Sequence, residues 1–270
     1  STSQDVFFGK VNASGGKVWD KFYGAADSSE FAFGVVQLDG GDFLIGYINE
    51  NLSNDQIRLL RVNGNGSKIS DKTVQTGDFY LNQLLRTSDG KIVLSGSEFS
   101  TGGTVSYILK VEENGSYIWD KRFPATPTNY TPAYGLTELP DKSLALAGSD
   151  LGDNDHDFNV VTFNEIGRKL WDRAWGGAKA DELFGIAATL DSHLVVMGYT
   201  NSFSSNVEIY LSKRKASDGS EIWERHFIAI GSGWGDVETA LDGGFVLVAG
   251  QNVANADVII VKTDKDGNFE

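Results

Sequence analysis

Four charged side chains lie near one level of a set of similar segments, and they form a candidate catalytic group. When the segments are aligned on a turn that contains Asp, Arg86 and Glu138 occupy the same level, and Asp236 and Glu238 lie nearby. Two carboxyl groups that face one glycosidic bond can serve as acid and base, or as acid and nucleophile, in its cleavage. This pattern predicts a glycoside hydrolase or lyase that uses these residues, as the alternative to a binding module, with a purely structural repeat in a larger surface protein as the third possibility.

A second candidate site is an acidic loop. The stretch DLGDNDHD (150–157) carries Asp150, Asp153, Asp155 and Asp157. Hard cations such as Ca²⁺ prefer oxygen ligands, and alternating carboxylates on a loop provide them. The stretch lacks the full spacing of a known calcium-binding loop, and Asx-type turns use the same residues. We therefore predict either a solvated turn or a calcium site, and we expect no other cofactor.

Two aromatic residues stand among small polar residues, where the pattern gives them no packing partner. They are Trp234, in GSGWGD, and Tyr130, in PTNYTP. Exposed aromatic side chains of this kind suit stacking on a sugar or anchoring of a partner protein. The alternative is a ring that folds over the end of its own loop. The two residues are our candidate ligand-binding residues.

Composition excludes several classes of function. The 270 residues include no Cys, so disulfides, thiolate metal sites and a Cys nucleophile are ruled out. The net charge of −14 argues against nucleic-acid binding, which needs clustered Lys and Arg. No apolar run is long enough to predict a span of a membrane. The three histidines fall at unrelated positions of the segments, so neither a Ser-His-Asp triad nor a His-rich metal site is predicted.

The candidate residues must be positioned by a repeat of about 50 residues. The stretch WDKFYG (19–24) returns as WDKRF (119–123), WDRAW (171–175) and WERHF (223–227), and ISDKTV (69–74) is a fifth copy with Ser70 in the Trp place. A glycine that closes an apolar run keeps the same period. Its copies are Gly46, Gly96, Gly148, Gly198 and Gly250.

Each period reads as four short strands, and none shows a sustained helical pattern. Four-stranded antiparallel units at this period predict an all-β fold, a β-propeller in one domain covering residues 1–270. Five first, second and fourth strands indicate five blades, with six or seven blades as the alternative. We expect the N-terminal hairpin (5–23) to complete the last blade, which leaves one third-type strand surplus.

The Trp segments admit two interpretations. Because alternate residues of a strand share a face, Trp19, Lys21 and Tyr23 point one way, and Val18 and Asp20 point the other. The copies repeat this arrangement, so the segment is either a repeated ligand site or a packing device between blades. Recurrence in every period and burial on two faces favour packing.

The segments NASGGKVWDKFYG (12–24) and KASDGSEIWERHF (215–227) resemble the Trp repeats of quinoprotein-type propellers. With the apolar strands that end in AGS or GYT, the chain resembles secreted bacterial β-propeller proteins of the surface or lipoprotein type. This resemblance implies an extracellular, periplasmic or cell-surface location, with any signal peptide or lipid anchor outside the sequence given. Quinone-dependent activity is not expected, since those enzymes are longer and use a disulfide. The leading prediction is a monomeric, non-catalytic module that binds protein or glycan through variable loops.

Overall fold

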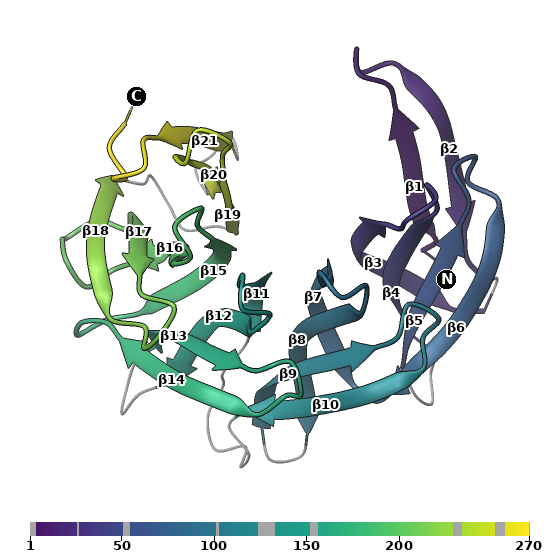
Figure 1. Cartoon of the computed structure of the whole chain (residues 1–270), viewed down its shortest axis with the longest axis horizontal. Coiled ribbons are helices and arrows are strands. Elements are labelled where there is room, and N and C mark those ends of the chain that lie inside the picture. The colour runs from purple at the N-terminus through teal and green to yellow at the C-terminus, as the bar shows by residue number, and fades with distance from the viewer. Residues whose placement is uncertain are drawn as a thin grey trace. The chain divides into compact units, whose positions relative to one another are not determined.

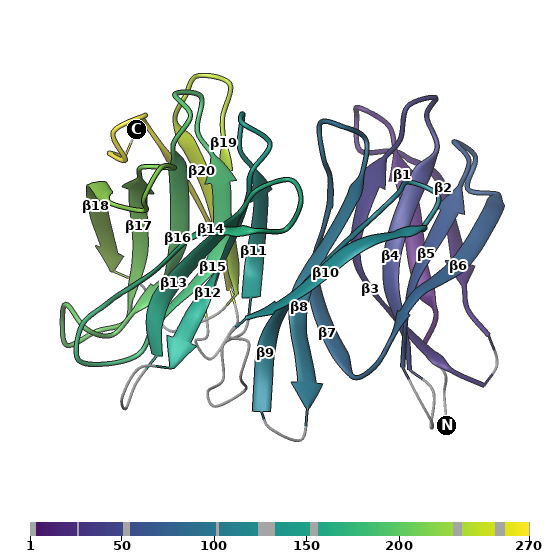
Figure 2. The same cartoon turned by 60° about the horizontal axis from the view of Figure 1, so that its bottom comes forward.

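A computed structural model describes residues 4–25, 27–50, 55–100, 103–123, 133–151, 156–228, 234–251 and 257–269. These residues form 21 strands (Figures 1 and 2). No helix among them is long and apolar enough to cross a membrane. The chain divides into two compact units. The first comprises Ser1–Thr101 and Tyr107–Arg122, and the second comprises Gly102–Ser106 and Phe123–Glu270.

The first unit contains a hairpin and two four-stranded sheets. The hairpin comprises β1 (Val6–Val11) and β2 (Lys17–Tyr23). The next sheet comprises β3 (Ser29–Gln37), β4 (Phe43–Glu50), β5 (Gln56–Val62) and β6 (Lys68–Thr76). The last comprises β7 (Phe79–Arg86), β8 (Ile92–Ser100), β9 (Gly103–Val111, which begins in the second unit's segment) and β10 (Tyr117–Phe123).

The second unit contains two four-stranded sheets and a three-stranded sheet. One comprises β11 (Ala133–Glu138), β12 (Leu144–Leu151), β13 (His156–Phe163) and β14 (Lys169–Trp175). The next comprises β15 (Asp181–Ala188), β16 (Leu194–Thr200), β17 (Glu208–Arg214) and β18 (Glu221–Ile228). The three-stranded sheet comprises β19 (Gly235–Thr239), β20 (Phe245–Gln251) and β21 (Asp257–Thr263).

The second strand of a complete sheet is more buried than the fourth, which explains the difference between their sequences. Every residue of β16 is buried, whereas in β14 Trp171 and Trp175 are half-buried and the other five residues are exposed. A strand that packs against neighbours on both faces needs a nearly continuous apolar run, as in LVVMGYT. The predicted four-strand unit and the antiparallel pairing are confirmed in the four complete sheets. Completion of the last blade by the N-terminal hairpin stays a prediction.

Within each unit, the Trp segments join one sheet to the next. The indole N–H of Trp19 donates to the Gly64 carbonyl oxygen at 3.1 Å, and that of Trp171 donates to the Ala216 carbonyl oxygen at 2.8 Å. Both carbonyls lie in the turn between the third and fourth strands of the following sheet. A Cβ on Gly219 in that turn would lie 2.8 Å from the Trp171 ring, so only glycine fits beneath the indole. These contacts support packing over a repeated ligand site.

The base two residues after the Trp position binds the same turn. Arg173 donates to the Asp218 carbonyl oxygen at 3.3 Å, and Arg225 donates to the Asp266 carbonyl oxygen at 2.7 Å. In the copy that has Ser70, Lys72 still donates to the Asn114 carbonyl oxygen at 2.9 Å. Aliphatic groups of Lys72 and Val74 cover Gly115 there, in place of an indole. The joint therefore survives the loss of its Trp.

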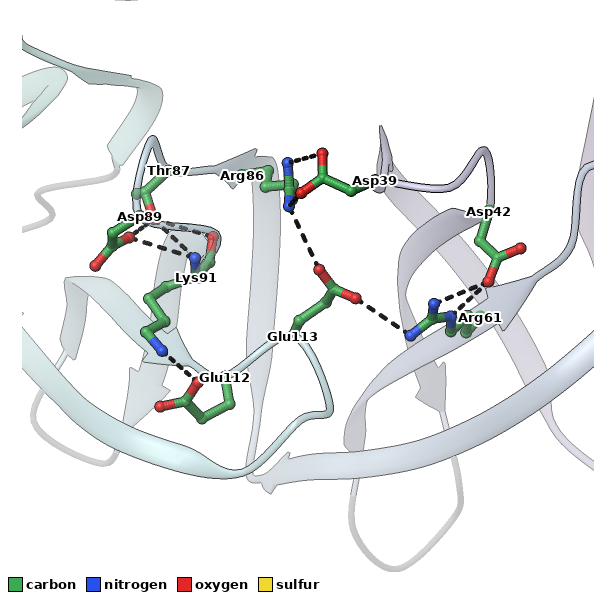
Figure 3. A network of polar contacts seen from close by, with 9 residues as sticks. All are labelled: Asp39, Asp42, Arg61, Arg86, Thr87, Asp89, Lys91, Glu112 and Glu113. Atoms are coloured by element: carbon green, nitrogen blue, oxygen red, sulfur yellow. Dashed lines mark hydrogen bonds and ion pairs between the residues drawn. The ribbon is translucent and has the colours of Figure 1, made fainter.

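A network of ion pairs links the two four-stranded sheets of the first unit (Figure 3). Glu113, in the turn between β9 and β10, accepts from Arg61 of β5 at 3.2 Å and lies 3.5 Å from Arg86 of β7. Arg61 also pairs with Asp42, and Arg86 pairs with Asp39. Since each guanidinium contacts two carboxylates, the network connects the β3–β4 and β9–β10 turns to β5 and β7.

Candidate ligand-binding site

Bulges in the first strands of two sheets place aromatic side chains at a cavity of the second unit. The register of β11 with β12 shifts between Ala133 and Gly135, and that of β15 with β16 shifts between Leu183 and Gly185. The residue left out of the ladder is Tyr134 in one strand and Phe184 in the other. A bulge redirects its extra side chain away from the regular alternation. Both residues line one cavity of about 310 Å³.

Four aromatic side chains meet at this cavity. The ring centroid of Tyr134 lies 5.1 Å from that of Phe184 and 5.0 Å from that of Trp234. Phe184 lies 5.5 Å from Trp234 and 5.7 Å from Tyr199. Trp234 is 59% exposed, while Tyr134 and Tyr199 are buried. Trp234 therefore presents a face to solvent that its neighbours hold in place.

Polar groups are few at this cavity. Glu182 of β15 and Asn201, just after β16, line it together with the aromatic residues. A carboxylate accepts hydrogen bonds, and an amide both donates and accepts them. The Tyr199 hydroxyl donates to the Gly250 carbonyl oxygen at 2.8 Å, which fixes that ring. The site is an apolar cavity with a small number of orienting polar groups, the usual form of a small-molecule site.

Two of the predicted catalytic carboxyls lie on β19, immediately after Trp234. Burial raises the pKa of Asp236, although the Val237 N–H donates to its Oδ1 at 2.9 Å. The pKa of Glu238 is raised by burial and, to a lesser extent, by the charge of Asp236. The Glu238 side chain reaches solvent, so ionisation of this carboxyl costs less than ionisation of Asp236.

The other two predicted catalytic residues have separate places. Glu138 ends β11, where it pairs across the ladder with Leu144. Arg86 ends β7 in the first unit, and its guanidinium donates to Asp39 at 2.6 and 3.2 Å. That ion pair lowers the pKa of Asp39. Arg86 thus belongs to the network of Figure 3, while the three carboxyls belong to the second unit.

The predicted calcium loop lies partly outside the described residues. Asp150 of β12 and Asp157 of β13 are described and face each other across the ladder, whereas Asp153 and Asp155 lie outside. Tyr130 lies outside as well. Within the described part of the chain, no three His, Cys, Asp or Glu side chains are placed to hold a metal ion. The calcium site stays a prediction.

Sequence reasoning found Trp234 but missed its neighbours. Tyr134 and Phe184 stand in segments that read as ordinary apolar strands, AYGLTEL and FGIAATL. The signal that could have found them is the glycine that follows each one. Gly135 and Gly185 mark the bulge, and an aromatic residue before a strand glycine is a candidate for redirection.

Comparison with known proteins completes the description of the fold. No protein-family model matches the sequence, and no curated protein matches it significantly. The chain is similar in structure to a protein of unknown function from Dyadobacter fermentans, with a TM-score of 0.62, 12% identity, and coverage of 90% of this chain and 81% of that one. It is also similar to an endo-arabinase from Bacteroides thetaiotaomicron, with a TM-score of 0.52, 14% identity, and coverage of 90% and 95%.

The fold is that of a β-propeller. A putative glucose dehydrogenase from Thermus thermophilus gives a third match, with a TM-score of 0.55, 11% identity, and coverage of 90% of this chain and 87% of that one. The arabinanase-type matches are five-bladed propellers, which confirms the predicted fold class. At these identities the likeness concerns the fold alone. Enzymes and a protein of unknown function share it, so the fold does not decide the activity.

Proposed function

We propose that this β-propeller is a non-catalytic binding module that takes a carbohydrate at the aromatic cavity of its second unit. The observation that carries the proposal is the convergence of Tyr134, Phe184 and Tyr199 on an exposed Trp234. A flat, rigid aromatic face gives large contact area at low entropic cost, and the apolar face of a sugar ring is its complement.

The polar groups of the cavity support a sugar over a fully apolar ligand. Glu182 and Asn201 supply acceptors and a donor at the rim of an otherwise aromatic wall. Sugar hydroxyls both donate and accept, so they satisfy such groups without burying an unpaired charge. The cavity volume of about 310 Å³ suits one or two sugar rings more than a protein loop. As part of the proposal, the module acts at the cell surface or outside the cell, like the secreted bacterial proteins that its repeats resemble.

The test is binding of a glycan library by the whole protein, followed by calorimetry on the best ligand. We expect Trp234→Ala to weaken binding at least about tenfold, which is about 1.4 kcal/mol, without lowering the melting temperature. Tyr80→Ala is the control, because Tyr80 is a half-exposed aromatic residue of the first unit, far from the second unit's cavity in sequence. Absence of any glycan ligand, or equal affinity in the Trp234 variant, would refute the proposal. Capture of a protein that needs Trp234 would replace the glycan with a protein ligand.

A second function has one observation in its favour. The raised pKa of Asp236 is the property that a general acid needs, and Asp236 follows Trp234 by two residues. A glycoside hydrolase or lyase built on Asp236, Glu238 and Glu138 would cleave chromogenic glycosides or an acidic polysaccharide. Asp236→Asn and Glu238→Gln should then each abolish turnover while leaving binding intact. Wild-type protein that binds glycans and releases no product excludes this function.

A further inference from the structure

The first unit contains a second, more polar cavity of about 400 Å³ beside the start of β3. Glu30 lines it and is only 4% exposed. Its Oε1 accepts from the Ser28 hydroxyl at 2.5 Å and from the Asn49 amide at 2.7 Å. Its Oε2 is buried, and no donor among the described residues reaches it. Burial removes a carboxylate oxygen from water, and a hydrogen bond offsets the lost hydration. A buried oxygen without a partner therefore destabilises the folded state.

A second carboxylate shares the gap in front of this oxygen. A Cβ on Gly24, which also lines the cavity, would lie 2.7 Å from Glu30 Oε2 and closer still to Asp5 Oδ1. Both oxygens therefore face the space that the absent side chain of Gly24 leaves. A larger residue at this position would place its Cβ in the gap between the two acids.

In the second unit, the equivalent pair of acids lies beside Gly176, and there the inner acid has hydrogen-bond donors for both of its oxygens. A Cβ on Gly176 would likewise lie close to Asp157 Oδ1 and 2.6 Å from Asp181 Oδ2. There, Asp181 Oδ2 accepts from the Gly177 N–H at 2.8 Å and from the Ser202 hydroxyl at 2.9 Å. Oδ1 of Asp181 accepts from the Thr200 hydroxyl. The chain thus satisfies the inner acid with its own donors in one repeat and leaves an acceptor open in the other.

The remaining charges of the polar cavity are already paired. Arg58 donates to Asp71 Oδ1 at 3.0 Å and to the Tyr47 hydroxyl at 2.8 Å, and Tyr47 donates to Asp71. Lys68 lies 4.0 Å from Asp71. The open hydrogen-bonding capacity at this cavity is therefore on the acidic side, at Glu30 Oε2.

We propose that this cavity binds a ligand through a primary ammonium group held between Glu30 and Asp5. An ammonium carries three donors on one small atom, so it can bind both oxygens at once. Tyr23 lines the same cavity, and aromatic rings attract cations. A calcium ion is a poorer occupant, because it takes six to eight oxygen ligands and no group of three acidic or histidine side chains is present among the described residues.

The experiment is calorimetry on the full chain with two ammonium probes, glucosamine and n-butylamine, and two neutral probes of matched shape, glucose and n-butanol. We expect the ammonium probes to bind and the neutral probes to fail. Binding of glucosamine alone identifies an amino sugar as the ligand class, and binding of both identifies the ammonium as sufficient. Equal binding of charged and neutral probes, or no binding of either amine, overturns the proposal. Calcium binding without amine binding also overturns it.

Three variants test the same gap in different ways. Glu30→Gln and Asp5→Asn should each weaken amine binding at least tenfold, and Gly24→Ala should block it by filling the gap while keeping both charges. Glu50→Gln, at an exposed carboxyl at the end of β4, is the matched control and should bind as wild type. If Glu30→Gln does not fold, exposed Asp5 still permits the test. Trp234→Ala should leave amine binding unchanged, so failure of this proposal and failure of the proposed function are distinguishable.

Discussion

At the scale of single residues, Asp236 is a carboxyl group whose surroundings disfavour its charged form. Burial raises its pKa, and its described partner is the neighbouring Val237 N–H. Oδ1 also lies 2.8 Å from the place that a Cβ on Gly185 would take. A carboxyl with a raised pKa destabilises the fold when it is ionised, because the folded state favours its protonated form.

Asp236→Asn should therefore raise the free energy of unfolding at pH 7. The amide keeps the acceptor for the Val237 N–H and cannot ionise. Because the folded pKa of Asp236 is raised, its destabilising effect is absent below the ordinary carboxyl pKa of about 4 and grows as pH rises through the folded value. The advantage of the variant should shrink as pH falls from 7 to 4 in urea unfolding. Exposed Asp27→Asn is the control and should show no such trend; loss of stability in the Asp236 variant at pH 7 would contradict the argument.

At the scale of elements, glycines set how closely the first strands of neighbouring sheets approach. A Cβ on Gly185 of β15 would lie 2.7 Å from the Val237 backbone nitrogen of β19. A Cβ on Gly135 of β11 would lie 2.9 Å from Ile186 and 3.1 Å from its backbone nitrogen. Backbone atoms cannot move aside as a flexible side chain does, so these contacts are sensitive to a single methyl group.

Gly185→Ala should accordingly destabilise the second unit by about 1–3 kcal/mol through overpacking. The control is Gly9→Ala in β1, where an added Cβ meets nothing closer than 3.6 Å and should be neutral or slightly stabilising. Chemical denaturation of both variants gives the comparison. Equal stability of the two variants would mean that β15 and β19 separate at little cost.

The sequence predicts these elements well because their signals are local. The turn that contains Asp, on which the segments align, lies between the first two strands of each sheet. Lys142 and Ser192 adopt there the left-handed φ (69° and 63°) that Gly90 and Gly243 adopt in other copies. The aromatic cavity was not predicted, because it depends on bulges in two strands. These bulges bring Tyr134 and Phe184 together, although the two residues are one repeat of about 50 residues apart in sequence. The open acceptor of Glu30 was not predicted either, because its environment depends on how the chain brings Gly24 and Asp5 against it.

At the scale of the whole molecule, the tryptophans serve two separate purposes. Trp19 and Trp171 are half-buried, donate to a carbonyl of the next sheet and repeat with the period. Trp234 stands outside that register, and more than half of its surface is open to solvent. Recurrence therefore identifies residues that hold the sheets together, and departure from recurrence identifies a candidate for ligand contact.

This separation predicts opposite effects of substitution at the two kinds of Trp. Trp171→Ala should lower the free energy of unfolding by about 3 kcal/mol, since it removes a large packed side chain. Trp171→Phe should lose only about 1 kcal/mol, because a ring still covers Gly219 and the hydrogen bond to Ala216 alone is lost. Neither variant should change glycan affinity, whereas Trp234→Ala should change affinity and leave stability within about 0.5 kcal/mol. Leu241→Ala, at a fully exposed side chain, is the stability control. If Trp171→Ala is as stable as wild type, or if Trp234→Ala loses as much stability as Trp171→Ala, the argument is contradicted. Recurrence in the repeat would then not distinguish a packing Trp from a ligand-binding Trp.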